Sequence, residues 1–373
     1  MIDGADRTLH IGVDARELVG HVTGVGRYLS EVLKAWASEP FPHRVTLFVP
    51  AETPDYGSAL GPMFATHVIA ADSAGTTWEQ TRLPGAARRA GIDVLFAPAY
   101  TAPLLLRRPV VPLIHDVSYC AHPEWFSGRD GLRRRWLTWA TARRAASILT
   151  VSEFSRSEIV KYLGVPENRM TIASPGAPRV VRPVPAVARE PIVLSVGSLF
   201  NRRRIPELIA GFAALAPRVP DATLVIVGDN RTAPPVDPRA IARQLGVEAR
   251  VSWREYVGDD ELESLYWRAR AFAFFSDYEG FAMTPLEALA HDVPAVMADT
   301  AVAREIYGDA ATRVPLDPRA IADALAPLLT DQGAHETAVA RGRARLNRFS
   351  WSRTAGIVRQ ALERAAQTTR TRT

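Results

Sequence analysis

The chain has 373 residues, of which 47% are hydrophobic and 23% charged, as in a soluble globular protein with room for two domains. No apolar run approaches the ~20 residues of a membrane-spanning helix, and the amino terminus lacks a signal-peptide pattern. A single cysteine, Cys120, excludes an internal disulfide, so we expect a cytoplasmic protein. The net charge of +5 and the pI near 9.6 favour an anionic partner: a phosphorylated substrate, a membrane surface or nucleic acid.

The first segment predicts a strand, a glycine-rich turn and a helix. Residues 11–14 form the expected strand, and residues 23–28, Thr-Gly-Val-Gly-Arg-Tyr, open a helix to about Trp36. A glycine-rich turn after a first strand lets the backbone approach a phosphate, and an ordinary tight turn is the alternative. Gly24 is the candidate for that approach.

A later strand places a histidine at its carboxyl end. Residues 44–49 and 93–96 predict strands, with a helix expected over 78–90 between them. The apolar run 109–114 predicts another buried strand, which is followed directly by His115. This position suits a ligand contact in an open α/β sheet, whereas a hydrogen-bonded structural histidine is the alternative.

The segment 128–146 predicts a helix with a basic side. Leu132, Trp136 and Trp139 fall on one helical face, and we expect that face to pack on the core. The arginines suit either solvent or the anionic headgroups of a membrane surface. They are Arg129, Arg133, Arg134, Arg135, Arg143 and Arg144.

The second half repeats the α/β alternation after a proline-rich linker over 178–191. The ranges 148–152 and 153–163 predict the last strand and helix before it. Beyond the linker, strands are expected over 192–196, 223–227, 251–252, 271–275 and 294–297, and helices over 205–215, 260–269 and from 349 onward. Two successive α/β units predict two Rossmann-like domains.

An arginine triplet follows the first strand of the second half. Residues 197–204 read Gly-Ser-Leu-Phe-Asn-Arg-Arg-Arg between a strand and a helix. Adjacent arginines are usually solvated, but on a loop at the carboxyl end of a strand they suit a diphosphate. Arg202 and Arg203 are the candidates.

Two glutamates lie eight positions apart after the buried strand 271–275. Residues 276–287 predict a loop and a helix start, with Thr284 as the N-cap and Pro285 in the first helical position. Such a start presents backbone N–H groups to an anion. Glu279 and Glu287 can face this site, and a solvated loop acid and a first-turn acid are the alternatives.

Together these motifs resemble glycosyltransferase family 4, in particular its mannosyltransferase branches. The resemblance rests on E-G-F-x-x-x-P-x-E from Glu279 to Glu287, T-G-V-G-R-Y from Thr23 and H-D at His115. The arginine triplet is similar to the family's R-K-N, with Arg203 in place of Lys and Arg204 in place of Asn.

The resemblance implies an α/β protein of the GT-B fold, with two Rossmann-like domains facing a central cleft. Residues 1–180 would form the acceptor-binding domain and 181–348 the nucleotide-sugar-binding domain. Residues 349–373 would form a helix that crosses back to the amino-terminal domain.

The resemblance also implies the site residues. Glu279, His115 and Arg203 would be catalytic. Donor-binding residues would be Gly24, Arg202, Arg203, Gly280, Phe281, Ala282, Met283, Thr284 and Glu287. No D-x-D triplet occurs in the sequence, so we expect no metal and no further cofactor.

The expected activity is retaining transfer of a hexose, mannose from GDP-mannose first, to a polysaccharide or lipid-linked glycan. UDP-sugars remain open as donors, and Glu279 could stabilise a cationic sugar or act as a nucleophile. The alternatives are a nucleotide-sugar epimerase or hydrolase, and a non-catalytic arginine-rich binding module. We expect weak peripheral binding to an anionic membrane on its cytoplasmic side and no nucleic acid partner.

Overall fold

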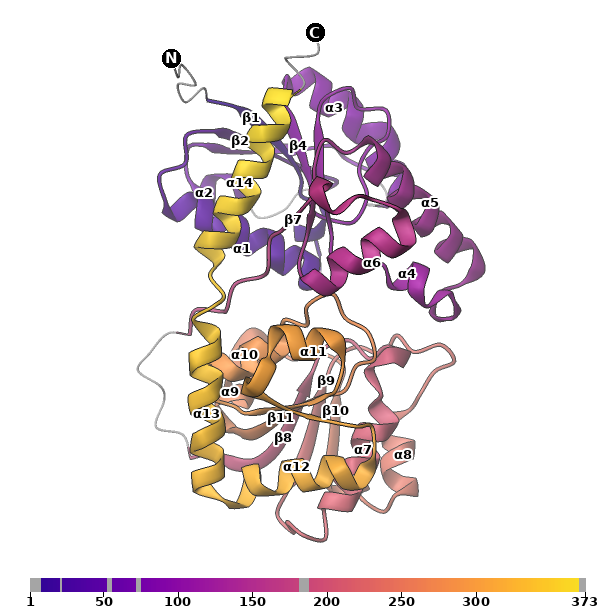
Figure 1. Cartoon of the computed structure of the whole chain (residues 1–373), viewed down its shortest axis with the longest axis vertical. Helices are drawn as coiled ribbons and strands as arrows, with labels where there is room; N and C mark the ends of the chain where they lie inside the picture. Colours follow the sequence, from indigo (N-terminus) through magenta and orange to yellow (C-terminus); the bar gives the residue numbers. More distant parts are fainter. Residues whose placement is uncertain (1–7, 21, 52–55, 72–74, 181–187, 369–373) are drawn as a thin grey trace. The chain divides into compact units, whose positions relative to one another are not determined.

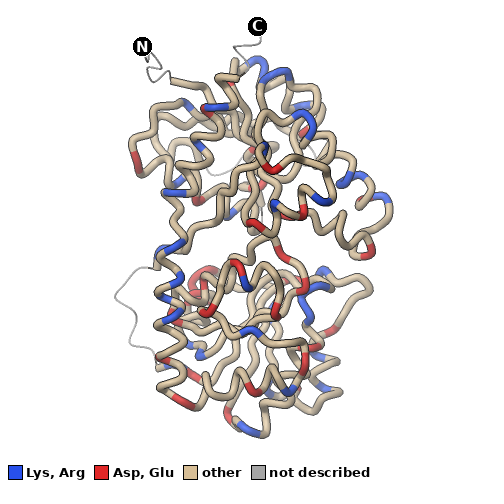
Figure 2. The backbone as a smooth tube through the Cα atoms, viewed as in Figure 1, with Lys and Arg blue, Asp and Glu red and all other residues tan. Residues whose placement is uncertain are grey.

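The computed structural model describes residues 8–20, 22–51, 56–71, 75–180 and 188–368. The chain divides into two compact units, one formed by 1–176 with 350–373 and the other by 177–349. Each unit is a parallel sheet with helices packed on it (Figure 1). Lysines and arginines occur in both units (Figure 2). Among the described residues, no helix is both long and apolar enough to cross a membrane.

The first unit contains a seven-stranded sheet in the order β3-β2-β1-β4-β5-β6-β7, with every neighbouring pair parallel. Its strands are β1 His10–Asp14, β2 Arg44–Val49, β3 Phe64–Val68, β4 Val94–Ala97, β5 Val110–Ile114, β6 Ile148–Thr150 and β7 Met170–Ile172. Its helices include α1 Gly24–Ser38, α2 Tyr56–Leu60, α3 Leu83–Ala90, α4 Ser118–Ala121, α5 Gly128–Arg144, α6 Glu153–Leu163 and α14 Trp351–Thr368.

The last helix, α14, belongs to the first unit although it ends the described chain. The Trp36 indole donates to the Ala355 carbonyl oxygen at 2.9 Å, which fixes α14 on α1. His43 Nε2 lies 2.9 Å from Glu363 Oε1 near the other end of the helix. Val358 and Leu362 are fully buried between these contacts, so packing as well as hydrogen bonding holds α14 in place.

The second unit contains a six-stranded sheet in the order β10-β9-β8-β11-β12-β13, again with every neighbouring pair parallel. Its strands are β8 Glu190–Val196, β9 Thr223–Val227, β10 Val251–Arg254, β11 Ala269–Phe274, β12 Ala295–Ala298 and β13 Ala311–Val314. Its helices include α7 Ile205–Leu215, α8 Pro238–Gln244, α9 Asp259–Arg268, α10 Thr284–Ala290, α11 Ala301–Ile306, α12 Pro318–Thr330 and α13 Gln332–Leu346.

Both sheets have the doubly wound strand order of Rossmann-like folds, as the sequence predicts. In each sheet the order reverses between two central neighbours, β1 and β4 in the first and β8 and β11 in the second. Open α/β sheets bind ligands at the carboxyl ends of the strands where this reversal occurs. The loops after β8 and β11 carry the arginine triplet and Glu279, so the topology brings these two motifs together.

One expectation about packing is wrong. Leu132, Trp136 and Trp139 share a face of α5, but that face is exposed, with exposed fractions of 66%, 57% and 42%. The buried side of α5 instead carries Leu137, Thr138, Thr141 and Ala142. Helical periodicity shows which residues share a face, but it does not show which face meets the core.

Some elements were not predicted, and part of the linker lies outside the described residues, over 181–187. Strand β3 is an edge strand whose side chains are mostly exposed, so it lacks the buried apolar run of its neighbours. Strand β13 and helices α12 and α13 were missed as well. Strand β8 begins at Glu190, two residues before the predicted start at Ile192.

Candidate active site

The loops after β8 and β11 are tied together by two hydrogen bonds. The Asp277 backbone N–H donates to the Arg202 carbonyl oxygen at 2.9 Å. Arg204 Nε donates to Asp277 Oδ2 at 2.6 Å. Arg204 itself has a positive φ of 46°. Arg204 was not among the predicted site residues, but its side chain links the two loops.

Glu279 lies against the arginine triplet rather than in solvent. Its Oε1 is 3.0 Å from Arg203 Nε and 3.6 Å from Arg202 Nε. The Ser276 hydroxyl donates to the same oxygen at 2.8 Å. The solvated-acid alternative for Glu279 therefore does not describe this loop.

The two arginines lie over aromatic rings. The Arg203 guanidinium is 4.3 Å from the Phe274 ring centre, and the Arg202 guanidinium is 4.4 Å from the Phe200 ring centre. Burial lowers the pKa of Arg203, and the Glu279 carboxylate opposes that shift. A guanidinium remains charged despite such a shift, so the site keeps two fixed positive charges.

The segment between the two glutamates turns sharply at Ala282, which has φ of 67°. Positive φ is costly for a residue with a Cβ and is found at sites where the surroundings enforce it. Here the buried Tyr307 hydroxyl donates a hydrogen bond to the Ala282 carbonyl oxygen. Tyr307 is far along the chain, and no motif in the sequence pointed to it.

The predicted cap at the start of α10 is wrong by one residue. Met283 precedes the helix in an αR conformation, Thr284 is its first residue, and Thr284 accepts no capping hydrogen bond. The Thr284 hydroxyl is buried and has no hydrogen-bond partner among the described residues. Pro285 occupies the second helical position and has no N–H. The first turn of α10 therefore has one fewer backbone donor that needs an acceptor.

Glu287 is buried in the first turn of α10. The Tyr266 hydroxyl donates to Glu287 Oε2 at 3.0 Å. The Tyr266 ring stacks on His291, with ring centres 4.9 Å apart, so the tyrosine is itself held in place. Tyr266 was not predicted as part of the site, because its partner Glu287 is 21 residues away in the chain.

In the first unit, the two glycines of the T-G-V-G-R-Y turn differ in their surroundings. A Cβ on Gly26 would lie 2.2 Å from the Glu17 carbonyl oxygen, so packing requires glycine there. Apart from its chain neighbours and its own helix, a Cβ on Gly24 would meet no described atom within 4 Å. Gly24 is the first residue of α1, where backbone N–H groups lack helical acceptors.

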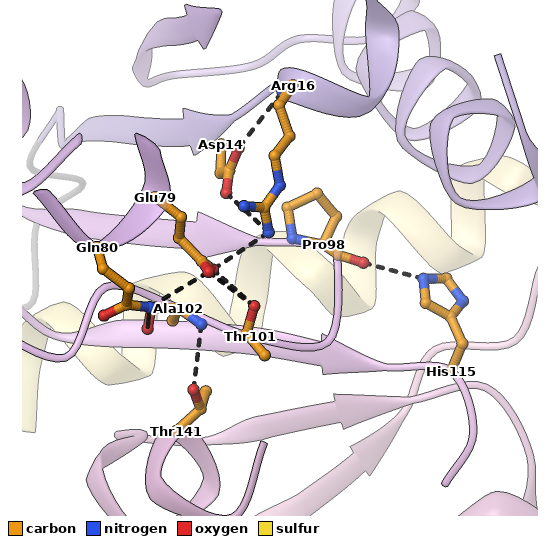
Figure 3. Close-up of polar contacts among 9 residues, drawn as sticks. All are labelled: Asp14, Arg16, Glu79, Gln80, Pro98, Thr101, Ala102, His115 and Thr141. Atoms are coloured by element: carbon orange, nitrogen blue, oxygen red, sulfur yellow. Dashed lines mark hydrogen bonds and ion pairs between the residues drawn. The ribbon is translucent and has the colours of Figure 1, made fainter. Parts of the chain in front are cut away.

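His115 follows β5 and is partly buried. Its Nε2 donates to the Pro98 carbonyl oxygen at 2.9 Å (Figure 3). The Tyr28 and Tyr100 rings lie 5.6 and 5.3 Å from the imidazole centre. Burial lowers the pKa of His115 to about 4, although the Pro98 hydrogen bond and Asp116 oppose this shift. The imidazole is therefore neutral at pH 7, with its proton on Nε2.

Comparison with known families accounts for both units. Residues 22–179 match the family described as "Glycosyltransferase Family 4", and residues 180–345 match "Glycosyl transferases group 1". O-antigen chain mannosyltransferase B of Escherichia coli is 30% identical over 274 residues, which cover 69% of this chain and 71% of that protein. The chain belongs to glycosyltransferase family 4. The resemblance inferred from the motifs is thereby confirmed.

Two further comparisons agree with this assignment. O-antigen chain mannosyltransferase RfbU of Salmonella typhimurium is 24% identical over 218 residues, covering 58% of this chain and 59% of that protein. The structure of HepE from Anabaena in complex with UDP and glucose aligns with a TM-score of 0.74 at 19% identity. That alignment covers 95% of this chain and 99% of HepE, and it shows the GT-B fold. This glycosyltransferase therefore transfers a sugar from a nucleotide-sugar donor to a glycan acceptor, within a retaining family.

A buried charge network in this glycosyltransferase was not expected from sequence (Figure 3). Arg16 Nη2 lies 3.2 Å from Glu79 Oε1 and 3.6 Å from Asp14 Oδ2. The Thr101 hydroxyl donates to both Glu79 carboxylate oxygens, at 2.8 and 2.9 Å. Burial raises the pKa of Asp14 to about 6, with Arg16 opposing and Glu79 adding to the rise. The network lies where β1 and β4 end, the reversal point of the first sheet.

This network adjoins a strained residue beside His115. Tyr100 precedes Thr101 and has φ of 66°, a conformation that is unusual for a bulky side chain. Its hydroxyl donates to Asp116 Oδ2 at 3.1 Å. Because Glu79 fixes Thr101, the network holds the backbone turn that places the Tyr100 ring against His115.

Proposed function

We propose that this glycosyltransferase transfers mannose from GDP-mannose to a polysaccharide or lipid-linked glycan, with retention and without a metal ion. The observation that carries donor binding is the cluster of Arg202, Arg203 and Glu279 at the reversal point of the second sheet. The choice of mannose rests on the two O-antigen chain mannosyltransferases among its relatives. UDP-glucose is the competing donor, because HepE is seen with UDP and glucose.

The proposed role of the arginines follows from the chemistry of the leaving group. When the sugar departs, negative charge develops on the β-phosphate oxygens. Arg202 and Arg203 offer fixed positive charge to those oxygens, and their contacts with Phe200 and Phe274 hold them in place before the donor binds. The backbone of Gly280, Phe281, Ala282 and Met283 and the Thr284 hydroxyl would add hydrogen bonds. The unpartnered, buried Thr284 oxygen supports this role.

Glu279 and Glu287 would then have different roles. Glu279 lies against Arg203 in the structure, so a bound diphosphate would compete for Arg203 and leave Glu279 to the transferred sugar. Glu287 would accept hydrogen bonds from the ribose hydroxyls, with the Tyr266 hydroxyl fixing its carboxylate. This division predicts that Glu279 acts on the rate and Glu287 on donor affinity.

Retention would proceed by attack on the face from which the phosphate leaves, with the leaving phosphate taking the proton of the acceptor hydroxyl. Glu279 would stabilise the cationic sugar during this step. In the first unit, the Gly24 backbone would approach the diphosphate, and neutral His115 would contact the sugar. The open space around Gly24 supports the first assignment, and the lowered pKa of His115 supports the second.

The proposal is tested by incubating the purified protein with GDP-mannose or UDP-glucose and a glycan acceptor, in the presence of a chelator. We expect a mannosylated product whose new linkage has the anomeric configuration of the donor, measured by NMR. Glu279→Ala should abolish transfer, whereas Glu336→Gln, on the exposed side of α13, should leave it unchanged.

Three results would contradict parts of the proposal. Wild-type activity in the Glu279→Ala variant would remove the catalytic assignment. Conversion of the nucleotide sugar to an epimer or free sugar without acceptor, and no transfer when acceptor is present, would favour the epimerase or hydrolase alternative. Transfer from UDP-glucose but not from GDP-mannose would keep the reaction class and change the donor.

A further inference from the structure

A pocket of about 530 Å³ lies in the first unit. Its walls come from residues 102–104 and 106–110 before and at the start of β5 and from residues 143–146 at the end of α5, with Thr141, Arg169 and Thr368 completing them. Among the described residues that line it, five are arginines and none is Asp or Glu. The arginines are Arg107, Arg108, Arg143, Arg144 and Arg169.

The pocket and His115 are at opposite ends of the same strand. Val110, the first residue of β5, lines the pocket, and His115 follows the last residue of β5. At ~3.3 Å per residue, Val110 and His115 are about 16 Å apart along the chain. A ligand in the pocket would therefore not occupy the proposed sugar site.

The charge of the pocket is not neutralised within the described residues. Arg107, Arg108, Arg143 and Arg144 are exposed and form no ion pair with a described carboxylate. Arg169 donates to the Ala145 carbonyl oxygen at 2.6 Å, which leaves its charge unpaired as well. Guanidinium groups that converge on a concave wall without a counterion are suited to phosphate oxygens, which they bind in a bidentate manner.

The neighbouring surface of α5 is apolar. Its exposed stripe consists of Leu132, Trp136 and Trp139, and Arg143 continues the same helical face into the pocket, 5.1 Å above the Trp139 ring. Leu105, between two pocket residues, is 78% exposed. Exposed tryptophan and leucine beside arginine are typical of a surface that enters a membrane interface. Arginines are also visible along α5 in Figure 2.

Four of the six arginines of α5 differ in whether a carboxylate pairs with them. Arg133 and Arg134 both bind the Asp130 carboxylate, Arg134 at 2.7 Å, so their charge is partly neutralised. Arg143 and Arg144 have no such partner among the described residues and lie in the pocket wall. Unpaired arginines therefore lie in the pocket wall at the carboxyl-terminal end of α5, whereas Arg133 and Arg134 are partly neutralised by Asp130.

We propose that the arginine pocket binds the phosphate-bearing headgroup of an anionic phospholipid while the α5 stripe enters the interface of the same membrane. The adjoining apolar stripe favours a lipid over a soluble phosphate, because a soluble anion would make no use of it. The leucines and prolines among the lining residues fit the glycerol and upper acyl carbons beside that phosphate. This inference does not depend on the donor or on the transfer reaction.

The test is co-sedimentation of the full-length protein with vesicles of phosphatidylcholine, with or without phosphatidylglycerol. We expect binding only to the phosphatidylglycerol vesicles. Each arginine near an anionic surface contributes about a factor of five, so Arg107→Gln with Arg144→Gln should weaken partitioning about 25-fold. Trp136→Ala should weaken it by a smaller factor, and wild-type tryptophan fluorescence should shift to shorter wavelength on binding.

The matched control is Arg319→Gln with Arg341→Gln, which removes the same charge from exposed positions of the second unit. This variant should bind the vesicles like wild type, and all variants should keep the wild-type far-UV circular dichroism. Equal loss in the control would mean that net charge alone drives binding, which contradicts a defined pocket. Binding of inorganic phosphate or pyrophosphate in calorimetry without any vesicle binding would make it a soluble-anion site, which contradicts the lipid proposal.

Discussion

Arg203 Nε lies 3.0 Å from Glu279 Oε1, so the proposed catalytic carboxylate and the proposed phosphate-binding guanidinium pair with each other. The pair has two consequences. It lowers the cost of keeping Arg203 buried, and it prevents a free carboxylate from repelling the incoming diphosphate. Donor binding would have to exchange this contact for one between Arg203 and phosphate.

We predict that Glu279→Gln lowers kcat at least about 100-fold, as loss of a charged group at a developing charge does. The same change frees Arg203 from its carboxylate, so GDP should bind at least as tightly as to wild type. The free energy of unfolding should fall by about 1–3 kcal/mol, because a buried charge loses its partner. Calorimetry with GDP and urea unfolding measure both effects. Weaker GDP binding in this variant would show that Glu279 contacts the nucleotide rather than the sugar.

Changes at Glu287 should act on donor affinity instead. Glu287→Gln should raise the donor KM about tenfold or more with a smaller change in kcat, because it weakens binding common to ground and transition states. Tyr266→Phe, which removes one hydrogen bond to Glu287, should produce a smaller change in the same direction, about threefold. Steady-state kinetics with varied donor distinguish the two roles. A change in kcat alone would place Glu287 at the reacting sugar.

The pH dependence of stability should report on His115. Its pKa is lowered from 6.5 to about 4 in the folded protein, so between these values the unfolded chain binds a proton that the folded chain does not. The free energy of unfolding should therefore decrease as the pH is lowered from 6.5 to 4. The loss is about 3 kcal/mol at most, at 1.36 kcal/mol per pKa unit. His115→Asn should lack this loss. Asp14, with its pKa raised to about 6, acts in the opposite direction and cancels in the comparison. Parallel stability curves for wild type and variant would show an ordinary pKa for His115.

The buried network around Arg16 should be essential for stability. Arg16→Met leaves Asp14 and Glu79 buried without a cation and should cost about 3–5 kcal/mol. Adding Glu79→Gln to Arg16→Met should recover part of that loss, because one of the two buried acids no longer needs neutralising. Urea unfolding of the single and double variants gives the coupling. Additive losses in the double variant would show that the three side chains do not act as a unit.

The sequence predicted what depends on local pattern. The buried runs of β5 and β11, the strand–loop–helix order after each, and the family motifs together placed His115, Glu279 and Glu287 at strand and helix ends. It did not predict Tyr266, Tyr307 or Arg16, because their partners are distant in the chain and ordinary in type. The exposure of the Leu132, Trp136 and Trp139 face of α5 was not predicted for a related reason. The helical spacing of apolar residues is the same whether their face packs on the core or is exposed.

The two glycines of the α1 turn provide a matched pair for the last prediction. Gly26→Ala places a Cβ 2.2 Å from the Glu17 carbonyl oxygen, so it should destabilise the protein by about 1–3 kcal/mol. Gly24→Ala meets no protein atom within 4 Å, so stability should stay the same or rise by up to about 1 kcal/mol. If the Gly24 backbone approaches the donor diphosphate, the added methyl group should still raise the donor KM about tenfold. Thermal unfolding and donor kinetics of the two variants test this contrast. Wild-type kinetics in a stable Gly24→Ala protein would remove Gly24 from the donor site.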